Sequence, residues 1–232
     1  MSQKMSDEQA LQLPASAGCP LSAARTAGRP RACDAEARMQ DLMTVAADLF
    51  LQKGYSKVSL EMIARKAHVA VRTIYVKFGG KAGLFREILR SGRESYFATM
   101  ENLETNVRPM REILIDFGMR MNQLLSSPAA INLHRMVIAE AAADPELAEA
   151  FFEAGPRQTR DALRTFFSRA DIRAQLRADM PPEQLAVHFI NCLMGDQLKR
   201  YLFMLQACGE HLDVPLVEQR IDLFLMGAQR SA

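Results

Sequence analysis

From about Ala35 onward, apolar residues recur at the spacing of α-helices, and this periodicity limits the possible folds more than any other feature. The first stripe, at positions i, i+3, i+4, i+7 and i+8, consists of Leu42, Val45, Ala46, Leu49 and Phe50. No strand-length alternation bounded by turn residues stands out. Prolines mark helix starts, where their missing N–H costs least, at Pro128, Pro145, Pro181, Pro182 and Pro215. The sequence therefore predicts an all-α protein of about nine helices.

The predicted helices fall into an N-terminal and a C-terminal group. The N-terminal group contains a helix that Gly54 closes, short helices at 60–67 and 71–77, and a fourth helix from about residue 81 to 104. The C-terminal group lies at roughly 109–126, 129–142, 145–170, 181–207 and 215–229. We therefore expect a tail at 1–34, which is disordered and partly basic, a first domain at 35–82, and a second domain at 83–232.

Composition excludes several classes of protein. The 232 residues are 49% hydrophobic and 24% charged, as in ordinary globular proteins with a core. No run of 18 apolar residues is present to span a bilayer, and the first nine residues include polar and acidic side chains where a secretory signal needs an apolar stretch. We expect a cytoplasmic protein without membrane contact. Free thiols, not disulfides, are expected at Cys19, Cys33, Cys192 and Cys208.

Charge is distributed unevenly along the chain. Residues 25–93 contain 14 Lys and Arg against 6 Asp and Glu, whereas residues 94–232 contain 14 against 19. Such a division suggests that the N-terminal part meets a polyanion, although a merely basic surface is an equal alternative.

The basic region contains two short helices with the dimensions of a helix-turn-helix, at residues 59–78. The second helix of this motif enters the major groove of DNA. Burial of Ile74 and Phe78 leaves the outer faces to other residues of that helix. The candidate DNA contacts are Ser59, Val71, Arg72, Thr73, Tyr75, Lys77 and Lys81, with Ser59 also a candidate N-cap. Arg72 suits guanine, whereas Tyr75 and Lys77 suit phosphates.

Residues 36–90 resemble the TetR family of transcriptional regulators. The matching positions are Phe50, Gly54, Ser59, Ile63, Ala64, Ala67, Val69, Ile74, Tyr75, Phe78, Lys81, Leu84 and Phe85. The resemblance implies a three-helix DNA-binding head on a helical body that binds a small effector and forms a homodimer. It also implies a repressor that binds palindromic operator DNA and is released by its effector. Residues 131–163 resemble the AefR-like type of C-terminal domain.

The head departs from the family pattern at four positions. His68 stands where glycine is usual in the turn, and a left-handed backbone there suits His less well than Gly. Ala70 replaces a capping Ser or Thr, a loss of about 0.5–2 kcal/mol of helix stability. Gly80 replaces a polar cap, and Gly83 occupies a commonly acidic position. Upstream, Arg29 and Arg31 resemble an arm that enters a minor groove, with an inert basic tail as the alternative.

The body supplies the candidate dimer and effector sites. The last helix is apolar on more than one face, and the resemblance implies a dimer interface there, at Val217, Ile221, Phe224 and Leu225. A pocket for a hydrophobic or aromatic effector is expected near Phe117, Met121, His134, Phe152, Phe166 and Gln197. The alternative for each of these six residues is a place in the core.

Two other classes of function remain as rivals. The sequence contains no GxSxG, HExxH or GxxxxGK[ST] motif, so no enzyme activity is expected. His188 and Cys192 share a helix face, but only Cys208 and His211 lie nearby as further ligands, so neither a metal nor a cofactor is expected. An architectural DNA-binding protein without an effector is the remaining alternative, and a solid core throughout the body would favour it.

Overall fold

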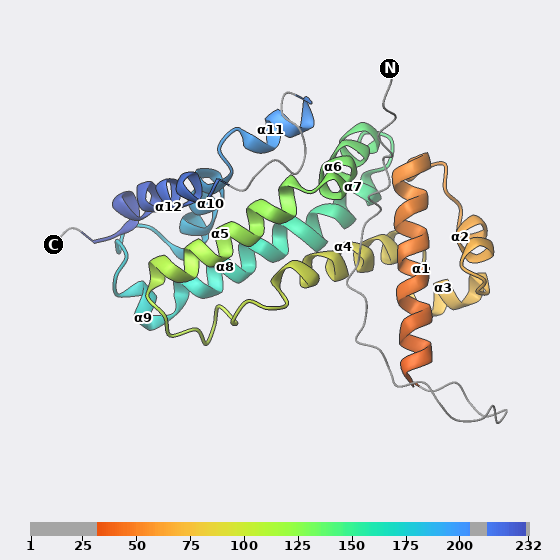
Figure 1. Ribbon diagram of the computed structural model, residues 1–232, viewed down its shortest axis with the longest axis horizontal. Helices are drawn as coiled ribbons and strands as arrows, with labels where there is room; N and C mark the ends of the chain where they lie inside the picture. The colour runs from red at the N-terminus through yellow and green to blue at the C-terminus, as the bar shows by residue number, and fades with distance from the viewer. Residues whose placement is uncertain (1–31, 205–212, 231–232) are drawn as a thin grey trace, which may run out of the picture. The chain divides into compact units, whose positions relative to one another are not determined.

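The computed structural model describes residues 32–204 and 213–230 (Figure 1). The regular structure of the described residues is α-helical, with one π-helical turn, and their only strand-like pairing is an isolated bridge between Leu176 and Gln229. The predicted all-α fold is confirmed. Within these two ranges, no helix combines the length and the apolar character that crossing a membrane requires.

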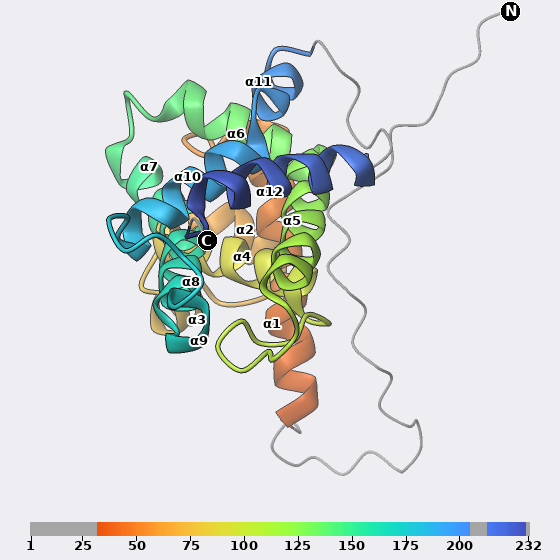
Figure 2. The same ribbon diagram turned by 90° about the vertical axis from the view of Figure 1, so that its left-hand side faces the viewer.

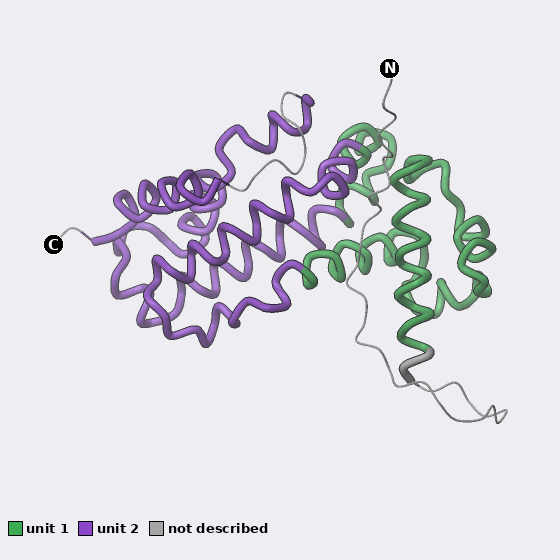
Figure 3. Tube along the Cα trace, viewed as in Figure 1, with its two compact units in different colours: residues 1–95, 136–150 green, residues 96–135, 151–232 purple. Residues whose placement is uncertain are grey.

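The chain divides into two compact units (Figure 3). Unit 1 contains residues up to Ser95 together with 136–150, and unit 2 contains residues 96–135 and 151–232. The domain boundary expected at residue 82 does not coincide with the boundary between the two units. Unit 1 also includes residues 83–95 and the segment 136–150.

Unit 1 is built on α1 (Ala32–Lys53), α2 (Leu60–Lys66), α3 (Val71–Phe78) and most of α4 (Lys81–Phe97). Its centre is an aromatic triad of Phe50, Tyr55 and Phe85, whose ring centroids lie 5.1–5.8 Å apart. These rings are at most 2% exposed. Because large aromatic side chains bury much apolar area, this triad fixes α1 and α4 against the turn that precedes α2.

Unit 2 contains the body helices. They are α5 (Met110–Ser126), α6 (Pro128–Glu140), α7 (Pro145–Phe152), α8 (Gln158–Ser168), α9 (Ala170–Arg173), α10 (Pro182–Met194), α11 (Gln197–Leu202) and α12 (Val214–Ala228), of which α6 and α7 also extend into unit 1. Helix α10 packs against α8 and α12, and α12 packs against α5 (Figures 1 and 2). The helices approach closely at Gly118 of α5, where a Cβ atom would lie 3.0–3.2 Å from side chains of Leu193, Val217 and Ile221. Glycine at this position therefore sets the separation of α5 from α10 and α12.

Three predicted helices are shorter or less regular than the periodicity indicated. The helix expected at 145–170 contains a π-helical turn, Glu153–Arg157, around Pro156, which cannot donate the backbone hydrogen bond of a regular helix. The helix expected at 181–207 breaks at Gly195, whose φ of 51° is left-handed. Helix α4 ends at Phe97 and not near residue 104.

Candidate nucleic-acid interface

Helix α2 and the turn that follows it form the first half of the motif. The Ser59 hydroxyl accepts a hydrogen bond from the Met62 N–H at 3.3 Å, which confirms Ser59 as the N-cap. Ile63 and Ala64 are buried and fix the inner face of the helix. The turn then passes through His68, whose φ of 54° is left-handed, as the replacement of glycine predicted. The helix-turn-helix geometry is thus retained with an unusual turn residue.

Helix α3 presents most of its side chains to solvent. Ile74 is fully buried and holds the helix on unit 1, while Arg72, Tyr75 and Lys77 are exposed. Val71 and Thr73 are half-buried. Ala70 makes no capping side-chain bond, as predicted, and Gly79 ends the helix with a φ of 76°. The exposed face therefore contains two cations and the hydroxyl of Tyr75, groups that suit contacts to phosphates and base edges.

Sequence reasoning missed one residue of this face. Val76 is 72% exposed, although an aliphatic side chain on a helix usually faces the core. Val76 follows Arg72 by four positions, so the two side chains lie on the same face of α3. An exposed apolar group beside a guanidinium suits a thymine methyl next to a guanine. The sequence did offer a signal for Val76, because it lies between Tyr75 and Lys77, which were both expected on the outer faces of this helix.

Further basic residues surround the motif. Between residues 57 and 77 the exposed charged side chains are Lys57, Glu61, Arg65, Lys66, Arg72 and Lys77, of which only Glu61 is acidic. Sequence reasoning did not single out Lys57, Arg65 or Lys66. A surface with this excess of cations attracts phosphates without reading sequence.

Lys81 is engaged within unit 1. Its Nζ atom donates hydrogen bonds to the carbonyl oxygens of Tyr55 at 3.1 Å and Val58 at 3.2 Å, and lies 4.2 Å from the centroid of the Tyr55 ring. The ammonium group thus holds the turn before α2. Two residues later, Gly83 allows a close approach, because a Cβ atom there would lie 1.7 Å from the Phe78 carbonyl oxygen. This contact explains glycine at a position where the family often has an acidic residue.

The six residues proposed for an effector pocket do not all come together. Phe117, Met121 and Phe166 are buried members of one core cluster in unit 2. Phe152 is 41% exposed and outside that cluster, with the Arg160 guanidinium 4.9 Å from its ring centroid. The same cluster also contains Phe167 and Phe189, with Phe97 packed against it, and Phe224, which was expected at the dimer interface. Of these four residues, sequence reasoning did not single out Phe189.

The two polar pocket candidates have partners. His134 packs edge-on against Phe151, with ring centroids 4.9 Å apart, and its Nδ1 lies 2.6 Å from the Ala130 carbonyl oxygen. Burial lowers the pKa of His134, against an opposing contribution from this hydrogen bond. The Gln197 side chain accepts a hydrogen bond from Asn122 and donates one to the Tyr201 hydroxyl.

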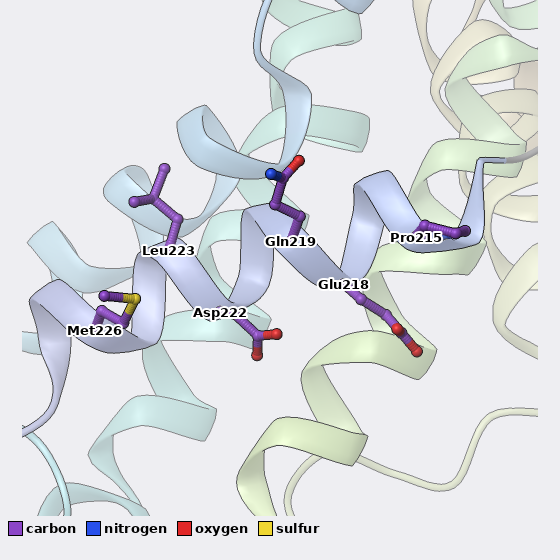
Figure 4. Close-up of a pocket in the computed structure, with 6 residues that line it drawn as sticks. All are labelled: Pro215, Glu218, Gln219, Asp222, Leu223 and Met226. Carbon is purple, nitrogen blue, oxygen red and sulfur yellow. The ribbon is translucent and has the colours of Figure 1, made fainter.

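The four residues expected at the dimer interface lie in the core of unit 2. Val217, Ile221, Phe224 and Leu225 are 1–5% exposed and pack inside unit 2, so they form the core of their own chain. The outer face of α12 instead presents Leu223, 64% exposed, and Met226, 80% exposed. These two side chains line a shallow groove of about 480 Å³ together with Pro215, Glu218, Gln219 and Asp222 (Figure 4). The periodicity identified an apolar helix, but it could not show which of its apolar faces its own chain covers.

Several predicted residues lie outside the described part of the chain. Arg29 and Arg31 of the basic arm belong to this group, as do Cys208 and His211. Among the described residues, no three His, Cys, Asp or Glu side chains gather as metal ligands would.

Comparison with known proteins agrees with this geometry. Residues 42–88 match the model of the bacterial regulatory proteins of the TetR family, and residues 112–227 match that of the AefR-like transcriptional repressor C-terminal domain. No curated protein is similar enough in sequence to count as a match.

Solved structures share the fold over most of the chain. The Flavonoid-responsive Regulator FrrA is 26% identical, with a TM-score of 0.67, and covers 85% of this chain and 100% of its own. NalD, the secondary repressor of the MexAB-OprM multidrug efflux pump in Pseudomonas aeruginosa, is 24% identical, with a TM-score of 0.59 and coverage of 86% and 100%. A TetR transcriptional regulator from Agrobacterium tumefaciens is 20% identical, with a TM-score of 0.63 and coverage of 83% and 95%. On these matches and on the geometry of α2 and α3, the chain belongs to the TetR family of transcriptional regulators.

Proposed function

We propose that this regulator is a homodimeric repressor, that it binds a palindromic operator, and that a hydrophobic or aromatic effector releases it from DNA. The observation that carries the proposal is α3, which combines a fully buried anchor, Ile74, with the exposed side chains of Arg72, Tyr75, Val76 and Lys77. A helix anchored on one face and polar on the other suits insertion into the major groove.

The exposed residues of α3 divide into two roles. Arg72 offers a bidentate donor to guanine, and Val76 offers an apolar contact to a thymine methyl. The DNA backbone or neighbouring bases are contacted by Tyr75 and Lys77. Thr73 and Val71, at the edge of the helix, make contacts of the same kind. Ser59 and Lys81 hold α2 and the turn before it, so we assign them a supporting role in place of the direct phosphate contact expected for Lys81.

The apolar stripe on α12 supports dimerisation. Leu223 and Met226 are large apolar side chains on the surface of one helix, and Val187, 40% exposed, lies on α10, which packs beside it. A second copy of the same stripe, related by two-fold symmetry, covers these side chains in the proposed dimer. Two heads on one symmetry axis then read two half-sites about 34–36 Å apart, or at multiples of that distance.

An aromatic effector is supported by the aromatic cluster of unit 2 and by the flavonoid response of the relative FrrA. The rings of Phe97 and Phe117 lie 5.3 Å apart, and those of Phe117 and Phe189 lie 6.0 Å apart. Asn106, 3% exposed, begins the segment that leads into α5, and its Nδ2 has no acceptor among the described residues. Because an unpaired buried donor is costly, we propose that this nitrogen donates to a polar group of a bound molecule.

A direct test begins with the selection of duplexes from a randomised pool by the purified full-length chain. The proposal expects an enriched inverted repeat, binding that weakens steeply as salt rises, and release when a flavonoid is added. Enrichment without release by any aromatic compound would reject the effector and favour an architectural role. Failure to enrich any duplex would reject the operator-binding function itself.

A further inference from the structure

The turn between α1 and α2 is held by a carboxylate from a distant part of the chain. The Glu140 side chain, at the end of α6, accepts hydrogen bonds from the backbone N–H of Tyr55 at 3.0 Å and of Ser56 at 2.7 Å. The Ser56 hydroxyl donates a third bond to the same carboxylate. These bonds span 84 and 85 residues of sequence and lie wholly within unit 1.

The turn is shaped to receive this carboxylate. Gly54 ends α1 with a φ of 85°, and a Cβ atom at this position would lie 2.6 Å from a Glu140 oxygen. On the other side, Lys81 donates to the carbonyl oxygens of Tyr55 and Val58. The donors of the turn thus face α6 while two of its acceptors face α4. Any movement of either helix is therefore applied to residues 54–58, which lead directly into the helix-turn-helix.

The charge of Glu140 is maintained by these contacts. Partial burial raises the pKa of its carboxyl, but the hydrogen bonds from Ser56 and Tyr55, with the charge of Lys81, outweigh burial and lower the pKa. The charged form that accepts three hydrogen bonds is therefore the stable form at neutral pH. Charge-assisted hydrogen bonds of this kind are stronger than neutral ones.

Helix α6 carries a second polar contact five residues earlier. The Arg135 guanidinium donates to the carbonyl oxygens of Tyr201 at 2.5 Å and Leu202 at 3.1 Å, which end α11. Arg135 belongs to unit 2, whereas Glu140 belongs to unit 1, and the two residues lie on one continuous helix. A helix is stiff over five residues, so a shift imposed at Arg135 reaches Glu140 with little loss.

We propose that Glu140 is a positioning residue for DNA binding, which fixes the turn at 54–58 and passes to it the state of the contact between Arg135 and α11. This inference rests on the proposed operator binding and adds the residue that connects α6 to the recognition motif. Without the carboxylate, three hydrogen-bond donors of the turn lose their acceptor, and the orientation of α2 and α3 is less firmly fixed.

The first experiment compares Glu140→Ala with the wild type on a duplex selected by the wild type. Glu149→Gln is the control, because it removes an exposed carboxylate from the same unit without changing the turn. We expect Glu140→Ala to remain folded and to exchange the amide hydrogens of Tyr55 and Ser56 faster than the wild type does. Its affinity for the duplex should be lower by a factor of at least about five. Unchanged affinity despite faster exchange would overturn the proposal. Should Glu140→Ala not fold, Glu140→Gln, which keeps one acceptor oxygen, is expected to bind with intermediate affinity, and wild-type affinity would overturn the proposal.

A double-mutant cycle separates positioning from general stabilisation. Arg135→Met is expected to change duplex affinity in the wild-type background and to have no further effect in Glu140→Ala, because the connection is already broken. Equal effects of Arg135→Met in both backgrounds would overturn the transmission through α6. A wild-type protein that selects no duplex would instead reject the proposed operator binding, so the two failures are distinguishable.

Discussion

The exposed stripe of α12 allows a quantitative prediction for the dimer. Truncating leucine to alanine removes about three carbons, which is about 2.4 kcal/mol of apolar transfer free energy at roughly 0.8 kcal/mol per carbon. Leu223 is 64% exposed in the single chain, so about 1.5 kcal/mol of this total depends on coverage by a second chain. A two-fold axis places the same side chain in the interface twice. The Leu223→Ala substitution is therefore expected to cost about 3 kcal/mol of dimerisation free energy, or about 100-fold in the dimer dissociation constant.

Analytical ultracentrifugation over a range of concentrations measures this constant. Val107→Ala is the matched control, because Val107 is 92% exposed on the segment before α5 and does not line the groove on α12. The control should dimerise like the wild type. A folded Leu223→Ala protein whose dissociation constant stays within threefold of the wild type would refute the assignment of this face.

Three further predictions concern single residues of the head and body. Val76→Ala should weaken binding to a selected duplex by about 1 kcal/mol. Replacing the contacted thymine with uracil should lower the affinity of the wild type for that duplex but not the affinity of the variant. Equal losses of affinity in both proteins would count against the methyl contact. Gly83→Ala should lower the melting temperature because the new Cβ meets the Phe78 carbonyl oxygen. Gly92→Ala, with open space around the new Cβ, should raise the free energy of unfolding by about 0.5–1 kcal/mol. A thermal melt in which Gly83→Ala is the more stable of the two variants would contradict the packing. Because the pKa of His134 is lowered in the folded protein, the unfolded chain takes up a proton at this residue first as the pH falls below about 6.5. The free energy of unfolding should therefore decrease on acidification, and His134→Phe should reduce that decrease. Identical pH profiles of the two proteins in chemical denaturation would contradict this.

The sequence was sufficient to predict the helical fold and the recognition motif. Periodicity located most helices to within a few residues, since an amphipathic stripe of 13 to 22 residues leaves little ambiguity. The cap at Ser59 and the left-handed His68 followed from local backbone chemistry, which depends only on neighbouring residues. These features were predictable because they do not depend on tertiary contacts.

The remaining features depend on contacts that a single sequence does not reveal. The face of α12 that its own chain covers is decided by α5 and α10, so Val217 and Leu223 could not be told apart from periodicity alone. Lys81 was expected to contact a phosphate, whereas its ammonium group donates hydrogen bonds to two carbonyl oxygens of unit 1. Glu140 gave no signal at all, because its partners lie more than 80 residues away. Pro156 was visible as a proline, but the π-helical turn around it depends on how α7 and α8 continue.

The central claim is that two copies of α3 read the major groove of one duplex. Sequence preferences measured for the wild type and for Arg72→Ala on the same randomised duplex pool test this most directly. The account predicts an inverted repeat for the wild type and, for Arg72→Ala, lost discrimination at one symmetric base position in each half-site, worth about 1–3 kcal/mol. A wild-type preference without two-fold symmetry, or identical preferences for the two proteins, would contradict it.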